Sequence, residues 1–588
     1  MSQSLINLLK RLWGHFLPRR HKQFTILFLF IVIVSFLEMI SLGAVIPFLI
    51  ILTDPKEIIS ISALQPLFQA MEISDPSQLV VPVTITFAGF SLIAGGAKLL
   101  LLWINTRFSN AVGADISIDM YRKTLYQPYT VHVSRNSSEV ISGITTKSNN
   151  VVSQIINPAL TLLSSSITLL TILASAIAYN PVIALSTFST FGILYILIAL
   201  DARKRLMRNG LIVARENTIV IKSLQEGLGG IRDVLLNGSQ EVYCEIYKQS
   251  DHPLRKANGN NAFIGYSPRY SMETLALVIM SFFAYMISLK YGGLTAMIPL
   301  LGALALGAQR MLPILQQGYQ AWASIKSSHI ILQDVLELLD LKLPAYSSQH
   351  DIKPLPFNQA IHLKNISFRY SKDSPLVLKD INLEIVKGSR VGFIGTTGSG
   401  KSTLQDIIMY LLEPTEGQLM VDDKVIHVNN MKSWQLNIAN VPQSIFLSDS
   451  SIAENIAFGI PLGQIDYKKV KQAASKAQIS DFIETLKDGY DTFVGERGIR
   501  LSGGQRQRIG IARALYREAS LIVFDEATSA LDNETERAVM ESIDGLGKDL
   551  TILIIAHRLS TVKNCDKIVE LSSGRIIKIT DGSKLPGV

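Results

Sequence analysis

The sequence predicts a helical transmembrane domain of six spans followed by an α/β P-loop domain. Three observations support this prediction. The 588 residues are 48% hydrophobic and only 18% charged, whereas globular proteins are about 25% charged. Six apolar segments in the first part of the chain are long enough to cross a bilayer, and a phosphate-loop motif lies in the second part. More than one domain is expected, because single hydrophobic cores rarely exceed roughly 250–300 residues.

Six segments meet the length needed for a membrane span, about 20 apolar residues in a helix. The first segment is longer than the apolar region of a signal peptide and no small-residue cleavage site follows it, so we expect it to stay in the protein. We place the transmembrane domain at residues 1–340, a linker at 341–354 and the second domain at 355–588. The predicted spans are residues 24–52, 79–105, 155–179, 181–200, 273–289 and 291–313.

The distribution of charge predicts the orientation of the membrane domain. The segment before the first span contains five basic residues and no acidic ones, and the connection 201–272 is also rich in Lys and Arg. In contrast, the connection 53–78 has more acidic than basic residues. Cytoplasmic segments carry the excess of Lys and Arg, so we expect the N-terminus, the long helical connections and the second domain to be cytoplasmic. The external segment 53–78 is either a packed loop or a short helix at the membrane surface.

A phosphate-binding loop follows a buried strand of the second domain. Residues 391–394 are apolar, and the residues after them match the motif G-x-x-x-x-G-K-[ST]. Glycines let backbone N–H groups surround phosphate oxygens, and the start of the following helix adds partial positive charge. We expect Lys401 to neutralise the β- and γ-phosphates and the Ser402 hydroxyl to bind Mg²⁺. The motif consists of Gly395, Thr396, Thr397, Gly398, Ser399, Gly400, Lys401, Ser402 and Thr403.

Two acidic residues follow a second apolar strand. Residues 521–524 lead directly into Asp525 and Glu526. Taken alone, such a pair is typical of a solvated turn, but beside a phosphate loop the end of a strand is where a Mg²⁺-binding carboxylate belongs. We assign that role to Asp525, and we expect Glu526 to polarise the water that attacks the γ-phosphate.

The segment between these two motifs contains the family signature. Residues 501–505 read Leu-Ser-Gly-Gly-Gln, and residues 355–588 closely resemble an ATP-binding cassette. Tyr370, Gln443 and His557 stand at further positions of the family pattern, and residues 495–498 resemble the segment that precedes the signature in exporters. The resemblance implies ATP and Mg²⁺ as cofactors, hydrolysis of ATP, and an exporter-type membrane domain with long cytoplasmic helix extensions.

The resemblance also implies a role for each site residue. Tyr370 stacks on adenine, Gln443 helps to bind Mg²⁺ together with Ser402 and Asp525, and His557 acts with Lys401 and Glu526 in catalysis. The signature residues would contact ATP that is bound to the loop of a second cassette, so a dimer encloses two ATP molecules. One cassette and one set of six spans indicate a half-transporter, and a homodimer is the simplest assembly, with a heterodimer as the alternative. The signature residues in question are Ser502, Gly503, Gly504 and Gln505.

Charged residues within the predicted spans bear on the transported molecule. Glu38, Lys98 and Arg310 lie within spans and Arg269 lies at the start of the fifth; such residues usually face the bundle interior or a water-filled cavity. One interpretation pairs Glu38 with a base such as Lys98 and lets Arg310 reach the membrane surface. The other forms a basic cavity from Lys98, Arg269 and Arg310 for an anionic head group such as pyrophosphate.

The membrane half resembles bacterial flippases for polyprenyl-pyrophosphate-linked oligosaccharides at residues 35–38, 45–48, 267–269 and 310–313. This resemblance implies ATP-driven flipping of a lipid-linked oligosaccharide from the cytoplasmic side, by alternating access, in a bacterial inner membrane. Alternatives are an exporter of lipid A, phospholipid, drugs or peptides and, in another class, an ATP-gated channel or a regulatory ATPase. The basic charge is explained by orientation, so no nucleic-acid partner is expected.

Overall fold

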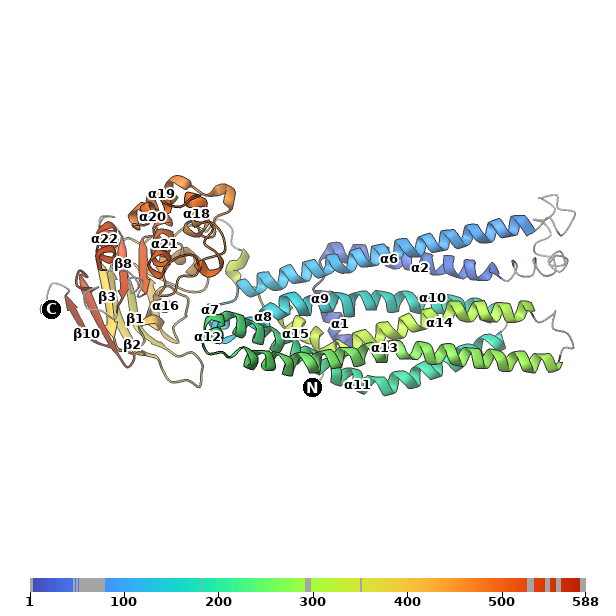
Figure 1. Cartoon of the computed structure of the whole chain (residues 1–588). Coiled ribbons are helices and arrows are strands. Elements are labelled where there is room, and N and C mark those ends of the chain that lie inside the picture. The colour runs from blue at the N-terminus through green and yellow to red at the C-terminus, as the bar shows by residue number, and fades with distance from the viewer. Residues whose placement is uncertain are drawn as a thin grey trace. The chain divides into compact units, whose positions relative to one another are not determined.

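The computed structural model shows two compact units (Figure 1). The first comprises Met1–Tyr126 and Arg135–Lys342, and the second, the cassette unit, comprises Gln127–Ser134 and Leu343–Val588. The predicted external segment 53–78 lies outside the described residues. The structure describes residues 4–45, 48, 51, 80–179, 181–290, 298–348, 352–525, 533–544, 550–556 and 562–581.

The membrane unit is built from helices, several of them far longer than a bilayer requires. Helices α6, α11 and α13 contain 46, 49 and 51 residues, whereas about 20 residues cross the hydrocarbon. This confirms the predicted helical extensions. The helices are α1 (Leu5–Gly14), α2 (Pro18–Gly43), α6 (Val80–Leu125), α8 (Ser137–Ser142), α9 (Ser148–Val151), α10 (Asn157–Tyr179), α11 (Pro181–Gly229), α12 (Ile231–Leu236), α13 (Gln240–Lys290), α14 (Ile298–Ser327) and α15 (His329–Leu339), with π-helical turns η2 (Gly143–Lys147) and η3 (Val152–Ile156).

Among the described residues, three helical stretches are long and apolar enough to cross a membrane: Pro18–Ser41, Val80–Leu125 and Ser137–Ala178. At most 28% of each apolar window is buried within the chain, so most of this surface is available to lipid or to another subunit. The other three predicted spans lie in α11, α13 and α14, where many side chains fall outside the described part. The number of six spans therefore stays a prediction.

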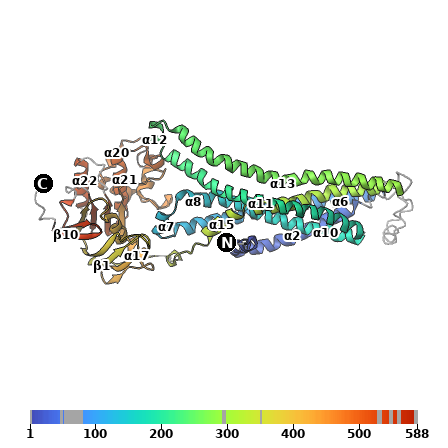
Figure 2. The same ribbon diagram turned by 90° about the horizontal axis from the view of Figure 1, so that it is seen from below.

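Two apolar clusters hold the membrane unit together. One joins α1, α2, α6 and α15 through side chains such as Leu8, Ile31 and Met120. The other joins α11, α13 and α14 through Leu206, Met272 and neighbouring residues. Helices α11 and α13 run side by side and are linked by α12 at one end, as both ribbon views show (Figures 1 and 2). Two prolines, Pro253 and Pro268, lie inside α13.

The cassette unit contains two sheets. A four-stranded antiparallel sheet has the order β2-β1-β4-β5, and a six-stranded sheet has the order β10-β9-β3-β8-β7-β6. In the second sheet β6, β7, β8, β3 and β9 are parallel and β10 is antiparallel. The strands are β1 (Ala360–Phe368), β2 (Leu378–Val386), β3 (Arg390–Gly395), β4 (Glu416–Val421), β5 (Lys424–Val425), β6 (Ile438–Val441), β7 (Leu521–Asp525), β8 (Thr551–Ile555), β9 (Lys567–Ser572) and β10 (Arg575–Asp581).

The parallel strands β7 and β8 are almost continuously apolar and buried, as expected for strands covered on both faces. One core cluster lies between the two sheets and α16, and a second packs α18, α19 and α21 against the six-stranded sheet. The helices of this unit are α7 (Tyr129–Ser134), α16 (Lys401–Ile408), α17 (Met431–Gln435), α18 (Ile452–Ile456), α19 (Tyr467–Lys476), α20 (Ser480–Glu484), α21 (Gly503–Tyr516) and α22 (Asn533–Asp544), with 3₁₀ turns η4 (Ala345–Ser348), η5 (Leu462–Gln464), η6 (Gly489–Asp491) and η7 (Glu496–Gly498).

Candidate functional site

The phosphate loop connects β3 to α16, as the motif predicts. Gly395, Gly398 and Gly400 all have positive φ angles. At Gly400, φ is 101° and a Cβ atom would lie 2.7 Å from the Leu378 side chain, so only glycine fits this position without strain. Glycine at these positions therefore permits the loop conformation that leads into the positive end of α16, where backbone N–H groups can bind phosphate oxygens.

Lys401 lies at the first position of α16 and its side chain is folded back over the loop. Its Nζ donates hydrogen bonds to the carbonyl oxygens of Gly395 and Thr396, at 2.8 and 3.1 Å. The Ser399 hydroxyl is buried and has no hydrogen-bond partner in the part of the chain that the structure describes. A cation and a buried donor on a glycine loop form a donor set that fits the phosphates of a nucleotide.

Strand order brings the phosphate loop and Asp525 to one edge of the six-stranded sheet. Strands β3, β8 and β7 are consecutive and parallel, with Phe393 and Asp525 both level with Ile555. Parallel strands about 4.8 Å apart end at the same edge. The phosphate loop, Asp525 and the residues that follow β8 therefore begin at this edge. Glu526 and His557 themselves lie outside the described residues.

A carboxylate that the sequence analysis missed lies beside this site. Asp406 is on α16, and burial together with the charge of Asp525 raises its pKa to about 6. The negative charge of these two interacting carboxylates suits a cation. The oxygen donors of Ser402, Gln443 and Asp525 are the ligands that Mg²⁺ prefers, so the chemistry of this donor set fits the ion. The signal that could have identified Asp406 was a carboxylate in the second turn of the helix that follows the phosphate loop.

Tyr370 follows β1 and is held beside the phosphate loop. Its hydroxyl lies 3.1 Å from Thr403 Oγ1, and its ring packs edge-on against Phe368. The side chain is still 53% exposed, so one surface of the ring is available for stacking. Tyr129 of α7 also belongs to this unit: its pKa is raised by burial and by the nearby charges of Asp406 and Tyr370. No feature of the sequence had placed Tyr129 with the cassette.

The signature residues form the start of α21. Ser502 is the N-cap: its Oγ accepts a hydrogen bond from Gln505 N at 3.2 Å, and Gln505 Oε1 accepts one from Ser502 N at 2.8 Å. This reciprocal capping box leaves the N–H groups of Gly503 and Gly504 at an open helix start. Helix α21 packs against α18, α19 and β6, whereas α16 packs against β3. The signature and the phosphate loop thus stand on different elements of the cassette.

The charged residues of the membrane unit are placed differently from those of the cassette. Lys98 Nζ lies 2.5 Å from Glu38 Oε1, which links α6 to α2. Arg269 Nε lies 2.8 Å from Glu273 Oε1, one turn along α13. Arg310 lies in α14, and its side chain falls outside the described part. The structure therefore brings Glu38 and Lys98 together, as the first of the two interpretations expects, and pairs Arg269 with an acid.

Comparison with known proteins supplies the family. Residues 378–529 match the family model described as ABC transporter, and residues 23–298 match the model described as ABC transporter transmembrane region. Together the two models cover most of the chain. The protein belongs to the ABC transporters. It is a half-transporter with one membrane region and one ATP-binding cassette, and its ATPase activity is coupled to transport.

Relatives of this ABC transporter agree with that assignment. The ATP-dependent lipid A-core flippase of Methylococcus capsulatus is 29% identical over 525 residues, which is 88% of this chain and 85% of that protein. The alpha-hemolysin translocation ATP-binding protein HlyB of Escherichia coli is 39% identical over 274 residues, 46% of this chain and 38% of its own length. A bacterial Atm1-family ABC exporter with ATP bound has the same fold, with a TM-score of 0.78 over 96% of both chains at 20% identity.

Proposed function

We propose that this ABC exporter flips a lipid-linked oligosaccharide, an anionic amphiphile, from the cytoplasmic to the outer leaflet of a bacterial inner membrane. The observation that carries the proposal is similarity to lipid A-core flippases over 88% of the chain. Lipid A and a polyprenyl-pyrophosphate glycan are both amphiphiles in which a phosphorylated head group is attached to long hydrocarbon. The particular choice of the oligosaccharide rests on the resemblance of residues 35–38 and 267–269, which contain Glu38 and Arg269, to flippases for polyprenyl-pyrophosphate-linked oligosaccharides.

In the proposed cycle, two copies of the chain bind two ATP molecules between their cassettes. Lys401 leaves the Gly395 and Thr396 carbonyls to neutralise phosphate charge, and the loop N–H groups donate to phosphate oxygens. The exposed N–H groups of Gly503 and Gly504 then contact the γ-phosphate held by the other copy. Tyr370 stacks on the adenine ring, and Glu526 orients the attacking water while His557 holds the γ-phosphate.

Mg²⁺ bound by Ser402, Gln443 and Asp525 would supply charge neutralisation at the β- and γ-phosphates. The negative charge of Asp525, which together with burial raises the pKa of Asp406, supports this role. The closed dimer binds ATP better than the open dimer, and this differential affinity shifts the membrane helices toward the outward-facing state. Reversal of a 1:99 equilibrium takes roughly 5.5 kcal/mol, which two bound nucleotides can supply.

Reconstitution tests the proposal. The purified protein in liposomes is assayed for ATP hydrolysis with lipid-linked oligosaccharides, lipid A, phospholipids and apolar drugs added in turn. We expect the strongest stimulation from the lipid-linked oligosaccharide, and a reduced response to it in Arg310→Ala. Stimulation by drugs alone, unchanged by Lys98→Ala or Arg310→Ala, would contradict the proposal. Stimulation by lipid A alone would leave the flippase function in place and exclude the oligosaccharide as substrate.

A further inference from the structure

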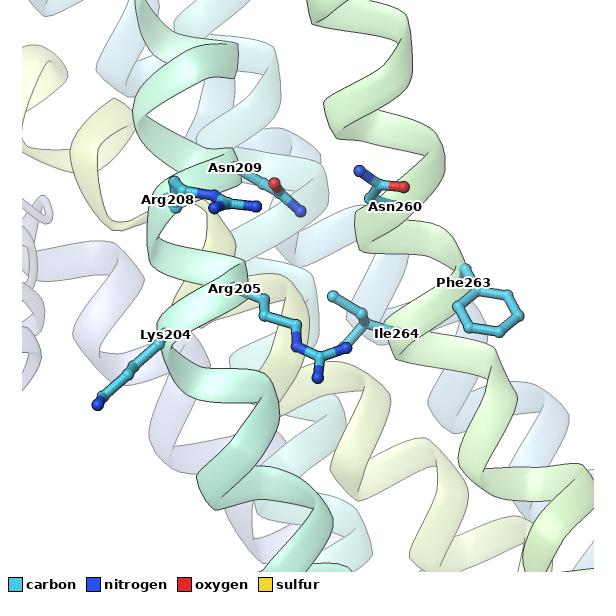
Figure 3. Close-up of a pocket in the computed structure, with 7 residues that line it drawn as sticks. All are labelled: Lys204, Arg205, Arg208, Asn209, Asn260, Phe263 and Ile264. Atoms are coloured by element: carbon cyan, nitrogen blue, oxygen red, sulfur yellow. The ribbon is translucent and has the colours of Figure 1, made fainter.

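A basic pocket lies between α11 and α13 of the membrane unit. Its volume is about 530 Å³, and Figure 3 shows its lining. Lys204, Arg205 and Arg208 come from α11, and no acidic side chain lines the pocket. The remaining lining residues are Asn209, Asn260, Phe263 and Ile264.

The charges of this pocket are only partly neutralised. Arg205 pairs with Asp201, one turn earlier on α11, at 3.0 Å. Among the residues that the structure describes, Lys204 and Arg208 have no ion-pair partner, in contrast to Lys98 and Arg269. The side chains of Arg205 and Arg208 extend from α11 toward α13 (Figure 3). Arg208, which has no ion-pair partner among the described residues, and Arg205, whose partner Asp201 is itself exposed, together favour binding of an anion such as a phosphate.

A hydrogen bond between the two helices holds the lining residue Asn209 in place. Buried Asn209 donates through Nδ2 to Asn261 Oδ1 at 2.9 Å, which holds α11 against α13 at this level. Asn260 stands beside it on α13 with an exposed side chain that can donate a hydrogen bond through its amide. Two guanidinium groups and an amide form a set of N–H donors suited to phosphate oxygens.

The positions of Lys204 and Arg208 along α11 indicate how far the pocket lies from the hydrocarbon of the membrane. The predicted fourth span ends at residue 200, so Lys204 and Arg208 follow it by about 6 Å and 12 Å at 1.5 Å per residue. Head groups occupy roughly 5–8 Å on each side of the hydrocarbon, so Lys204 and Arg205 lie at their level and Arg208 lies on the cytoplasmic side of it. Exposed aromatic side chains continue along α13 toward the predicted fifth span at Phe263, Tyr266 and Tyr270. A hydrocarbon tail can lie along them while the head occupies the pocket.

We propose that this pocket is the loading site for the transported amphiphile, and that Arg205 and Arg208 bind the phosphate or pyrophosphate of its head group from the cytoplasmic leaflet. This inference rests on the proposed function for the identity of the substrate. It adds a head-group site outside the predicted spans, distinct from Lys98, Arg269 and Arg310.

Binding of a prenyl diphosphate tests the site directly. The full-length protein in phosphatidylcholine nanodiscs is titrated with radiolabelled farnesyl diphosphate, and with farnesol as the probe without charge. We expect the double variant R205Q/R208Q to bind farnesyl diphosphate at least tenfold more weakly, since each basic residue near a membrane surface contributes about a fivefold effect. The matched control R215Q/K222Q removes two charges from the same helix outside the pocket and should stay within twofold of the unmodified chain.

Three outcomes would overturn the inference. One is equal affinity of R205Q/R208Q and the unmodified chain for farnesyl diphosphate. Another is displacement of farnesyl diphosphate by phosphatidylglycerol with equal affinity, which would make the pocket a general site for anionic lipid. The third is dissociation of the dimer in R205Q/R208Q alone, measured by size-exclusion chromatography, which would make this face a subunit interface.

ATPase assays separate this inference from the proposed function. If lipid-linked oligosaccharide stimulates the unmodified chain, we expect R205Q/R208Q to raise its half-saturating concentration about tenfold and to leave the maximal rate within twofold. An unchanged half-saturating concentration would reject the loading site and leave the proposed function standing. If no anionic amphiphile stimulates hydrolysis, the proposed function fails, while a tenfold loss of farnesyl diphosphate binding would still support the pocket as a phosphate site.

Discussion

The cassette and the membrane unit hold their candidate binding residues in different ways. In the cassette, the phosphate loop and the signature are contiguous segments whose shape is set by main-chain geometry, through the positive φ of Gly400 and the capping box of Ser502. In the membrane unit, Glu38 and Lys98 come from different helices and meet only because those helices pack together. The local sequence therefore determines the shape of the phosphate loop and of the signature. In the membrane unit, the packing of the helices determines which charged side chains meet.

The largest expected effect tests the cassette side of this comparison. Glu526→Gln should retain ATP binding and lower the rate of phosphate release by about a hundredfold or more, because it removes the group that polarises water but keeps its shape. Phosphate release and ATP retention are measured on the same preparation. Glu518→Gln, which alters a surface pair with Lys469 in the same unit, serves as the control and should hydrolyse ATP normally. A normal rate in Glu526→Gln would remove Glu526 from the proposed role.

The second prediction tests how closely the membrane helices must pack. A Cβ atom on Gly210 of α11 would lie 2.1 Å from the backbone oxygen of Ser327 at the end of α14. Gly210→Ala should therefore force the helices apart and destabilise the membrane unit by about 1–3 kcal/mol. Thermal unfolding in detergent measures the loss. On the same helix, a Cβ at Gly192 meets nothing within 4 Å, so an equal loss in Gly192→Ala would show that packing at Gly210 is not the cause.

The third prediction tests whether Lys98 stabilises the fold through its ion pair with Glu38 or is available to bind the substrate. Glu38 is nearly buried, with its side chain 12% exposed, so Lys98→Gln leaves a carboxylate without its partner. Each of Glu38→Gln and Lys98→Gln should destabilise the protein, and the double variant should be more stable than the two single effects predict, with a coupling of about 1–2 kcal/mol. Additive effects on thermal unfolding would mean that the pair is not coupled and would leave Lys98 available to the substrate.

The smallest effect is expected from variants of the two capping boxes of the cassette. Ser451 caps α18 with Glu454 in the same arrangement in which Ser502 caps α21 with Gln505. Ser451→Ala and Ser502→Ala should each cost about 1 kcal/mol of stability, the usual value for loss of an N-cap. We expect only Ser502→Ala to lower the ATPase rate beyond what this stability loss explains. Equal ATPase rates in the two variants would contradict a nucleotide role for the signature hydroxyl.

The same distinction explains what the sequence could predict. The loop 395–403 lies between a strand and a helix as expected, because its motif, strand and helix are adjacent in the chain. The position of Asp525 beside β8 follows from strand order, which alternating strands and helices indicate only in outline. The pairing of Lys98 with Glu38 stayed open, since several helix arrangements bring a base to Glu38.

Other parts of the site gave no local signal at all. Tyr129 joins the cassette only because the chain turns between α6 and α8, and Asp406 matters only because β7 places Asp525 beside it. Lys204, Arg205 and Arg208 read in the sequence as charges that orient the membrane domain. Their common pocket appears only when α13 lies against α11 and supplies Asn260. Long-range packing, rather than residue type, decides these features.

Pro268 has a mechanical consequence for α13. Proline has no N–H, so the Ile264 carbonyl one turn earlier loses its usual donor, and the helix bends more easily here than in its uninterrupted parts. Ile264 lines the basic pocket and Arg269 directly follows the proline. A small change of angle at this hinge changes the distance between these two groups while the helical segments on either side stay rigid. Pro268 thus separates the pocket-lining part of α13, which carries Asn260 and Ile264, from the part that begins with Arg269.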